Sequence, residues 1–331
     1  MIAIASVGAQ PGTARQVFAG GKSGRLHKET RCFFPRCRNG KLCAPLRNHS
    51  GAFFVYNTSR KSGAAQCDRT RKGALCVKRL LIRADDLGYS QGVNCGIAAT
   101  VAAGLVRSVG VMTNMPAAVH GLGLLAGHPV CLGQHTNICV GRPLTDPARI
   151  PSLCTPEGEF KPGRAYRDAA KAGEDFVVLE EVVEEIEAQY RQFKALTGKK
   201  PGYFEGHAVA SPNFFKGLEM VAARHNLPYF AMGRPGQAVT FRSTKVYAYM
   251  PKNLAAYEAD PFTGVQDAVA NAHEDGCDLM VFHPGYLDAY LLDHSTMTTA
   301  RVREAAMLCR PEVRVWLEGQ PVQLVTYDDL A

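Results

Sequence analysis

Residues 78–86 read KRLLIRADD, in which Leu80, Leu81 and Ile82 form a short apolar run and two acidic residues end the segment. A short continuous apolar run of this kind is typical of a strand buried on both faces, as in a parallel sheet. The next segment carries Val93, Ile97, Val101 and Leu105 at helical spacing. A buried strand followed by an amphipathic helix is the first unit of an α/β fold.

The same alternation of strand and helix continues downstream of this unit. Further strands are predicted over residues 108–113, 130–135, 203–206 and 278–282, and further helices over residues 117–126, 176–196 and 212–225. A long loop rich in Pro and Gly covers residues 141–173. This order predicts a TIM-like (β/α) barrel, complete or irregular, over residues 77–331.

The basic charge of the chain is confined to its first quarter. Residues 1–78 hold 15 Lys and Arg against 2 Asp and Glu, whereas the remaining residues hold 23 against 28. Residues 1–76 lack sustained periodicity, and we expect a disordered basic extension that precedes the folded domain. A start codon assigned too far upstream would also explain it, since Val77 directly precedes the first strand. Nucleic-acid binding through this extension is the alternative, although no recognisable module supports it.

Cysteine and hydropathy patterns indicate a cytoplasmic protein. Residues 1–19 have no basic start and no apolar run of the length that a secretory signal needs. The uncharged stretch 108–141 contains histidines and asparagines that a membrane span would not carry, so we expect no membrane partner. The extension holds Cys32, Cys37, Cys43, Cys67 and Cys76 at spacings unlike those of a zinc site. Reduced cysteines in a reducing compartment are the default.

Ionisable side chains recur where predicted strands end. Asp85 and Asp86 end the first strand, His135 ends the third, and His207 and His283 follow later strands. Because parallel strands bring their carboxyl ends to one edge, these side chains can meet. Two imidazoles and a carboxylate suit a divalent ion, and further groups there could exchange protons. Taken singly, the aspartates could equally form a turn or helix cap, and each histidine a hydrogen-bonded core residue.

The motifs of this chain resemble those of the YdjC-like carbohydrate deacetylases, the ChbG/HpnK group. The opening strand, turn and helix of that family read A-D-D-[FL]-G, and its later motifs include G-x-H-x-N and C-H-P-G-Y-x-D. The matching segments occur in family order: ADDLGYS (84–90), GVN (92–94), GLVRS (104–108), NMPA (114–117), GQHTN (133–137), GRPL (141–144), GEF (158–160) and FHPGYLD (282–288).

The resemblance implies hydrolysis of an N-acetyl group on an amino sugar at a divalent metal ion. By motif position, Asp86, His135 and His207 would be the ligands of the ion. Asp85 would activate the attacking water, and His283 would act as the acid or stabilise the tetrahedral intermediate. Because neighbouring residues of an extended chain point to opposite sides, we expect one aspartate to bind the ion while the other reaches the water.

One segment departs from the family pattern. Where the family reads D-S-H-x-H-V-H, residues 205–211 read EGHAVAS, which keeps His207, loses the later histidines and replaces aspartate by Glu205. The surroundings of the ion and the substrate rim should therefore differ. Arg142, Tyr286 and Asp288 are the candidates for binding a polar substrate.

The sequence thus predicts a metal-dependent hydrolase that deacetylates an N-acetylated amino sugar or oligosaccharide, in the cytoplasm and with no nucleic-acid partner. A non-catalytic carbohydrate-binding barrel that has lost turnover with the missing histidines is the alternative from another class. The expected cofactor is one divalent ion, Mg²⁺ or Zn²⁺, with Mn²⁺ and Co²⁺ also compatible with the ligands. A homodimer is left open.

Overall fold

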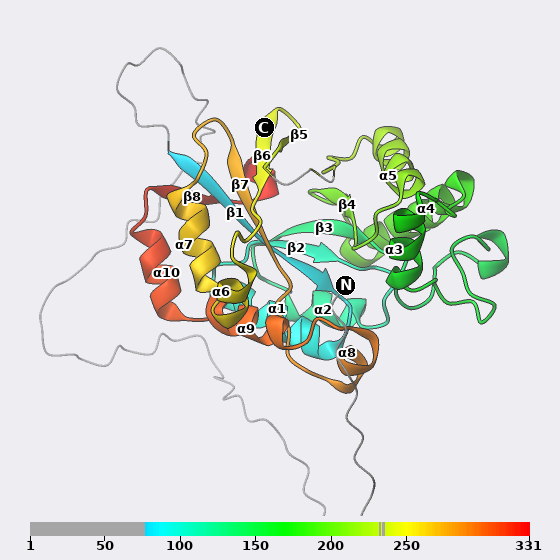
Figure 1. Ribbon diagram of the computed structural model, residues 1–331, viewed down its shortest axis with the longest axis horizontal. Helices are drawn as coiled ribbons and strands as arrows, with labels where there is room; N and C mark the ends of the chain where they lie inside the picture. Colours follow the sequence, from blue (N-terminus) through cyan, green and yellow to red (C-terminus); the bar gives the residue numbers. More distant parts are fainter. Residues whose placement is uncertain (1–76, 232, 234–235) are drawn as a thin grey trace, which may run out of the picture. The chain divides into compact units, whose positions relative to one another are not determined.

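The computed structural model describes residues 77–331 except residues 232, 234 and 235. The predicted basic extension, its five cysteines and its alternative role in nucleic-acid binding lie outside the described residues. The described part contains one sheet of eight strands, which is curled and flanked by helices (Figure 1). Its strands are β1 (Lys78–Leu87), β2 (Ser108–Val111), β3 (Cys131–Thr136), β4 (Phe204–Gly206), β5 (Ala238–Phe241), β6 (Thr244–Ala248), β7 (Cys277–Phe282) and β8 (Val322–Val325).

The sheet is parallel except at one edge. Its strand order is β4-β3-β2-β1-β7-β6-β5, and only β5 runs antiparallel to its neighbour β6. Strand β8 pairs with the beginning of β1, while β2 pairs with its end. The two ends of this order do not pair within the described residues; β4 instead bridges Tyr229. The predicted (β/α) barrel is therefore confirmed in its irregular form, a curled half-barrel.

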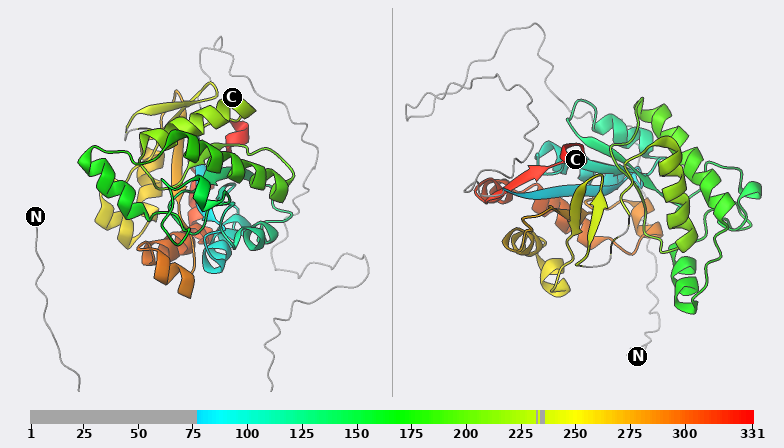
Figure 2. Two further views of the ribbon diagram at one scale, coloured as in Figure 1. Left: turned by 90° about the vertical axis from the view of Figure 1, so that its right-hand side faces the viewer. Right: turned by 90° about the horizontal axis from the view of Figure 1, so that it is seen from above.

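Helices follow most of the parallel strands and pack on the outer surface of the sheet. In Figures 1 and 2, α7, α9 and α10 lie on one side of the molecule, and α3, α4 and α5 lie beside β3 and β4. The helices are α1 (Gln91–Ala102), α2 (Ala118–Leu124), α3 (Gly163–Ala172), α4 (Leu179–Thr197), α5 (Pro212–His225), α6 (Leu254–Ala259), α7 (Phe262–Ala270), α8 (Ala289–His294), α9 (Thr299–Leu308) and α10 (Pro311–Glu318).

The two faces of β1 show how the strand directs its side chains. Leu80 and Ile82 belong to the apolar cluster shared with α1, α7, α9 and α10. Leu81 points to the opposite face and packs with Tyr203 and Tyr327 inside the curl of the sheet. Because side chains alternate along a strand, Arg83 and Asp85 share the inner face with Leu81. The charged end of β1 is thus carried into the mouth of the half-barrel.

Within the described residues, no helix has the length and apolar character that a membrane crossing requires.

Candidate metal centre

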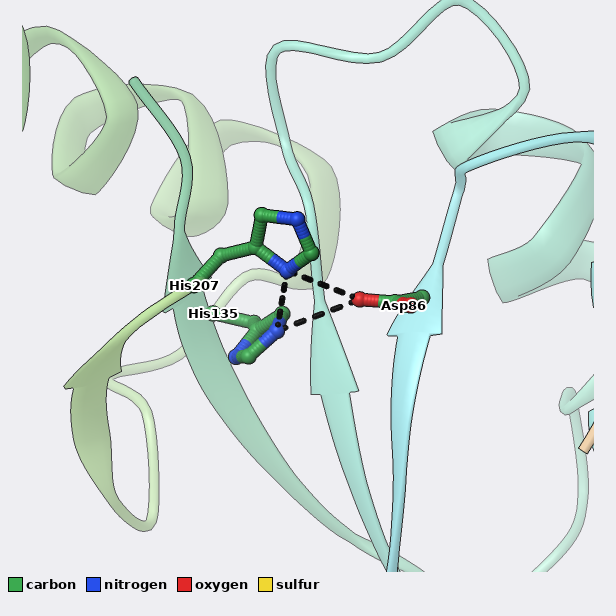
Figure 3. Close-up of side chains that lie close together, drawn as sticks. All are labelled: Asp86, His135 and His207. Carbon is green, nitrogen blue, oxygen red and sulfur yellow. Dashed lines mark hydrogen bonds and ion pairs between the residues drawn. The ribbon is translucent and has the colours of Figure 1, made fainter. Parts of the chain in front are cut away.

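The carboxyl ends of three strands bring one carboxylate and two imidazoles together (Figure 3). Asp86 lies near the end of β1, His135 in β3, and His207 directly after β4. Asp86 Oδ1 is 3.2 Å from His135 Nε2 and 3.0 Å from His207 Nδ1, and the two nitrogens are 2.9 Å apart. All three residues are buried. The structure therefore brings together the three residues that the sequence analysis selected as ligands.

The backbone at Asp86 departs from regular strand geometry. Asp86 has a φ of 75°, in the left-handed region that non-glycine residues rarely adopt. The pairing register between β1 and β2 also shifts between Ala84 and Leu87. Simple strand alternation would point Asp85 and Asp86 to opposite sides, but both carboxylates lie close to His135. The irregular backbone at Asp86 thus leaves both carboxylates near His135, and the division of roles between the two aspartates stays a prediction.

Each of the two aspartates is held by a buried arginine. Arg83 donates to Asp85 Oδ2 at 2.7 Å, and Arg301 of α9 donates to Asp86 Oδ2 at 2.7 Å. Asp85 Oδ1 accepts no hydrogen bond from the described residues although it is buried, and Asp86 Oδ1 contacts the two imidazole nitrogens. A buried carboxylate oxygen without a donor is costly, which indicates a partner such as a cation or water.

Glu205 orients the ring of His135. Its Oε1 contacts His135 Nδ1, and its Oε2 lies 3.6 Å from Arg83. When Nδ1 donates its proton to this carboxylate, Nε2 keeps a lone pair directed at Asp86 and His207. A carboxylate behind a metal-binding histidine fixes its tautomer and raises its basicity. Glu205 thus supplies the carboxylate at the position where the resemblance has aspartate.

The charges of the cluster are strongly coupled. Burial alone would raise the pKa of Asp86, but His207 and Arg301 outweigh it and hold that pKa well below its ordinary value. Burial would also raise the pKa of Asp85, but the positive charges of Arg83, His135 and His283 outweigh it, and this pKa is lowered. Burial would lower the pKa of His207, but Asp86 raises it to about 9. Both aspartates are therefore carboxylates at neutral pH, and the cluster favours positive charge beside them.

The donor set fits a divalent cation. Two imidazole nitrogens and one carboxylate oxygen, all within 3.2 Å of one another, match the ligands of catalytic zinc and related ions. A cation bound between the three atoms would satisfy Asp86 Oδ1 and take the place of the imidazole protons there. The second group of Asp85, His135 and Glu205 is less suited to an ion, because Arg83 already contacts both of its carboxylates.

The model of one protein family, described as YdjC-like protein, matches residues 79–319 of this chain. The chain belongs to the YdjC-like family. The resemblance predicted from the motifs is thereby confirmed, and the match includes every residue that the sequence analysis assigned to the site.

Curated relatives of this YdjC-like chain align with it over nearly the whole of their own length. A carbohydrate deacetylase of Geobacillus stearothermophilus is 32% identical over 253 residues, which cover 75% of this chain and 96% of that protein. Carbohydrate deacetylase 2 of Listeria innocua is 29% identical, with 76% and 98% covered. The chitooligosaccharide deacetylase of Serratia marcescens is 28% identical, with 76% and 99% covered.

A solved structure shows the same fold. An Enterococcus faecalis V583 protein, provisionally described as a cellobiose-phosphate cleavage protein, superposes with a TM-score of 0.64 at 21% identity. The superposition covers 77% of this chain and 99% of that one. The irregular half-barrel is therefore an architecture that a solved protein shares.

The third histidine selected from the YdjC-like motifs, His283, directly follows β7 and is partly buried. Its backbone N–H donates to Glu304 Oε2 at 2.6 Å, and Tyr257 donates to the other oxygen of Glu304 at 2.7 Å. The imidazole lies near enough to Asp85 to lower the pKa of that carboxyl group. His283 and Asp85 therefore share one part of the mouth, and Glu304 anchors the turn that carries His283.

The substrate candidates lie on loops at the same edge of the sheet as the aspartates and histidines. The Arg142 side chain is 66% exposed and donates to the carbonyl of Glu157 at 3.1 Å. Asp288 caps α8 through Leu291 N–H at 2.8 Å and also accepts from Gly92 N–H at 2.6 Å, so both its oxygens serve the backbone. Tyr286 is exposed. In the structure Asp288 holds the start of α8 and the start of α1, and substrate binding by Asp288 stays a prediction.

Val209 and Ser211 stand where the family motif has its later histidines, and both contribute to packing or capping. Val209 is buried in the apolar cluster shared with α4 and α5. Ser211 caps α5 by accepting from Phe214 N–H at 3.1 Å and donates to Asp175 at 2.9 Å. The departure from the family motif thus leaves the residues around Asp86 intact and alters the segment that leads into α5.

Several functional side chains had no assignment in the sequence analysis. Arg83 could have been found, because a charged residue inside a strand that is predicted to be buried needs a buried partner. Arg301 lies 215 positions from its partner Asp86, and nothing in the local sequence of α9 marks it. Glu304 follows one turn later on the same helix and is equally unmarked.

Proposed function

We propose that the protein is a metal-dependent hydrolase that removes the acetyl group from an N-acetylated amino sugar or oligosaccharide. The observation that carries the proposal is the convergence of Asp86 Oδ1, His135 Nε2 and His207 Nδ1 within 3.2 Å of one another. The curated relatives named as carbohydrate deacetylases support the substrate class. A cytoplasmic location stays a prediction from the sequence.

Asp86, His135 and His207 would hold one divalent ion. When bound, such an ion polarises the acetyl carbonyl and acidifies a water molecule. The two imidazole nitrogens favour Zn²⁺, with Mn²⁺ and Co²⁺ next, over Mg²⁺, which prefers oxygen ligands. Arg301 fixes the orientation of Asp86, and Glu205 fixes that of His135, so the ligand atoms are held in place before substrate arrives.

Asp85 is the base in this proposal. Arg83 holds its Oδ2, which leaves Oδ1 free to accept the proton of the attacking water. Gly110 makes room for this oxygen, since a Cβ at that position would lie 2.8 Å from Asp85 Oδ1 and 3.1 Å from His135 Cβ. Because the pKa of Asp85 is lowered, this residue is ionised at neutral pH, and only the ionised carboxylate can accept a proton.

His283 is the acid in this proposal. Water adds to the acetyl carbon, the carbon–nitrogen bond breaks, and the proton from His283 goes to the departing amine. The products are acetate and the free amino sugar. The hydrogen bond from the His283 N–H to the buried Glu304 restricts the backbone that carries this imidazole.

Acetate release from a panel of N-acetyl sugars tests the proposal, with Mg²⁺, Mn²⁺, Zn²⁺ and Co²⁺ supplied separately. In Asp85→Asn we expect kcat to fall by about 10²–10⁴-fold, the usual contribution of a general base. Metal content, measured by mass spectrometry of the elements, should stay unchanged because the three proposed ligands remain. Asp275→Asn, an exposed aspartate elsewhere, serves as the control.

The proposed activity is abandoned if the metal-loaded protein releases no acetate from any sugar of the panel. Full turnover in Asp85→Asn would leave the activity standing but remove Asp85 from its role as base.

A further inference from the structure

A pocket of about 570 Å³ opens beside the proposed metal centre. Three loops form it: the one after β1 with the start of α1, the one between β2 and α2, and the one between β7 and α8. Two of these loops follow the carboxyl ends of β1 and β7, near Asp85, Asp86 and His283, and the third follows the neighbouring β2, so the pocket lies on the same rim. It is lined by aromatic rings and small side chains, which include Tyr89, Cys95, Ala117, Tyr286 and Tyr290.

Tyr89 connects the pocket with the metal centre. Its backbone N–H donates to the carbonyl of Asp86 at 3.0 Å, which places the two residues within one tight turn. The guanidinium of Arg301 lies 5.4 Å from the centre of the Tyr89 ring and binds Asp86 Oδ2 at 2.7 Å. A substrate whose acetyl group lies at Asp86 can therefore place the group attached to its sugar ring in the pocket.

Three polar side chains of the pocket wall are engaged with the protein. Ser90 caps α1 by accepting from Val93 N–H, and Asp288 accepts from Gly92 and Leu291. The hydroxyl of Tyr89 donates to the carbonyl of His294 at 3.0 Å. Tyrosine rings and small residues make up most of the remaining lining, so the wall presents mainly carbon. The lining therefore favours an apolar occupant.

Exposed apolar side chains continue from the pocket along the neighbouring segment. Leu287 is 48% exposed and Leu292 of α8 is 57% exposed, next to Tyr286 at 43%. Scattered single apolar residues on a surface are ordinary, but a contiguous group beside a pocket marks a binding site. The volume lies in the usual range for pockets that enclose a small organic group.

We infer that this pocket binds an apolar alkyl or aryl group attached to the acetylated amino sugar. The inference rests on the proposed function for the sugar part, but the affinity of the pocket for an apolar group can be measured without turnover. The substrate class becomes an amino-sugar conjugate with an apolar aglycone, in place of an unmodified sugar.

Protection of Cys95 from alkylation tests occupancy in the full-length wild-type protein. Cys95 lines the pocket and is exposed, and glutathione labelled in the same mixtures serves as the control for effects on the reagent. Iodoacetamide labelling of each cysteine is followed by peptide mass spectrometry with octyl, phenyl or methyl β-glucoside, the first kept below its micelle concentration. We expect octyl or phenyl glucoside to slow labelling of Cys95 several-fold and methyl glucoside to leave it unchanged. The comparison of octyl with phenyl glucoside shows whether chain or ring fits better.

Kinetics with matched substrates test the role of the pocket in catalysis. For wild type, we expect kcat/KM for octyl N-acetyl-β-glucosaminide to exceed that for the methyl analogue about tenfold or more, since each buried methylene contributes roughly fourfold. Cys95→Trp fills the pocket and should reduce this ratio to about one. Ala102→Trp, an equally exposed position at the other end of α1, should keep it.

The outcomes separate the pocket from the reaction. Equal labelling of Cys95 with all three glucosides overturns the inference, whatever the activity. Selective protection without acetate release from any substrate supports the pocket but contradicts the proposed function. Acetate release with equal kcat/KM for octyl and methyl substrates supports the function and overturns the inference.

Discussion

Two buried arginine–aspartate pairs organise the candidate metal centre at the level of single residues. Arg83 and Arg301 each bind one oxygen of an aspartate and leave the other oxygen without an arginine contact. With Glu205 included, these five side chains carry one net negative charge. Without an ion, this negative charge is met by the imidazole of His207, whose pKa Asp86 raises to about 9 against the effect of burial. A bound divalent cation would supply the positive charge instead and would find its ligands there.

Arg301 should control the affinity of the site for its ion without touching the ion. In Arg301→Met we expect the Kd for Zn²⁺ to rise about 10–100-fold, because residues that orient ligands commonly have effects of this size. Arg301→Lys keeps the charge but not the paired contacts to Met297 and His283, and should lie between wild type and Arg301→Met. Calorimetric titration of metal-free protein measures the affinities.

The matched control is Arg303→Met on the same helix, where the arginine is exposed and contacts the carbonyl of Glu258. An unchanged Kd in Arg301→Met, together with normal folding, would show that Asp86 does not need Arg301 to bind the ion.

At the scale of elements, glycines allow the close approach of strands and rings around the site. A Cβ at Gly133 of β3 would lie 2.2–2.4 Å from ring atoms of Tyr203, which is far too close. This contact seats Tyr203 inside the half-barrel, where its ring stacks on Tyr327 at 4.1 Å. The strand that carries His135 is thereby packed against the interior that carries Arg83.

Gly133→Ala should lower the free energy of unfolding by about 1–3 kcal/mol, the usual cost of forcing extra volume into a packed core. Gly123→Ala in α2, where no atom lies within 4 Å of the added Cβ, should instead leave stability unchanged or raise it by up to about 1 kcal/mol. Urea unfolding of both variants measures the difference. Equal stability of the two would mean that the interior adapts freely around Tyr203.

The sequence predicted those elements whose periodicity is set by one strong apolar face. The helix predicted over residues 212–225 corresponds to α5 with the same limits, and the one over residues 176–196 corresponds to α4 shifted by a few residues. The hairpin of β5 and β6 and the edge strand β8 had no prediction. Their side chains are largely half-buried or exposed, so they lack a long apolar run.

The candidate metal centre could be predicted from sequence because its residues lie at or just after the ends of three parallel strands, β1, β3 and β4. The rule that such ends meet at one edge brought the aspartates and histidines together, and the family resemblance selected Asp86, His135 and His207 among them as ligands. The role of Arg301 depends on how α9 packs near the end of β1, which is tertiary information. The backbone irregularity at Asp86 is equally invisible in the residue pattern, since aspartate in a strand does not imply a positive φ.

At the scale of the whole molecule, the ligands join segments far apart in the chain. Asp86, His135 and His207 belong to β1, β3 and the segment after β4, so an ion bound by all three would link these segments in the folded state. The unfolded chain offers no such arrangement, and binding should therefore stabilise the fold. At an ion concentration 100 times the Kd, the expected gain is about 2.7 kcal/mol.

Thermal unfolding with and without added Zn²⁺ measures this gain, and a chelator should reverse it. His207→Ala should remove the stabilisation by the ion while its metal-free Tm stays measurable. A wild-type Tm that does not respond to any of the four candidate ions would contradict binding of an ion to the native state.

The central claim is that Asp86, His135 and His207 together bind one divalent ion. Anomalous diffraction from crystals grown with Zn²⁺, recorded on both sides of the zinc absorption edge, locates the ion directly. The account predicts one strong peak about 2.0–2.2 Å from Asp86 Oδ1, His135 Nε2 and His207 Nδ1. A peak bound by other residues, or none between these three atoms at saturating Zn²⁺, would contradict it.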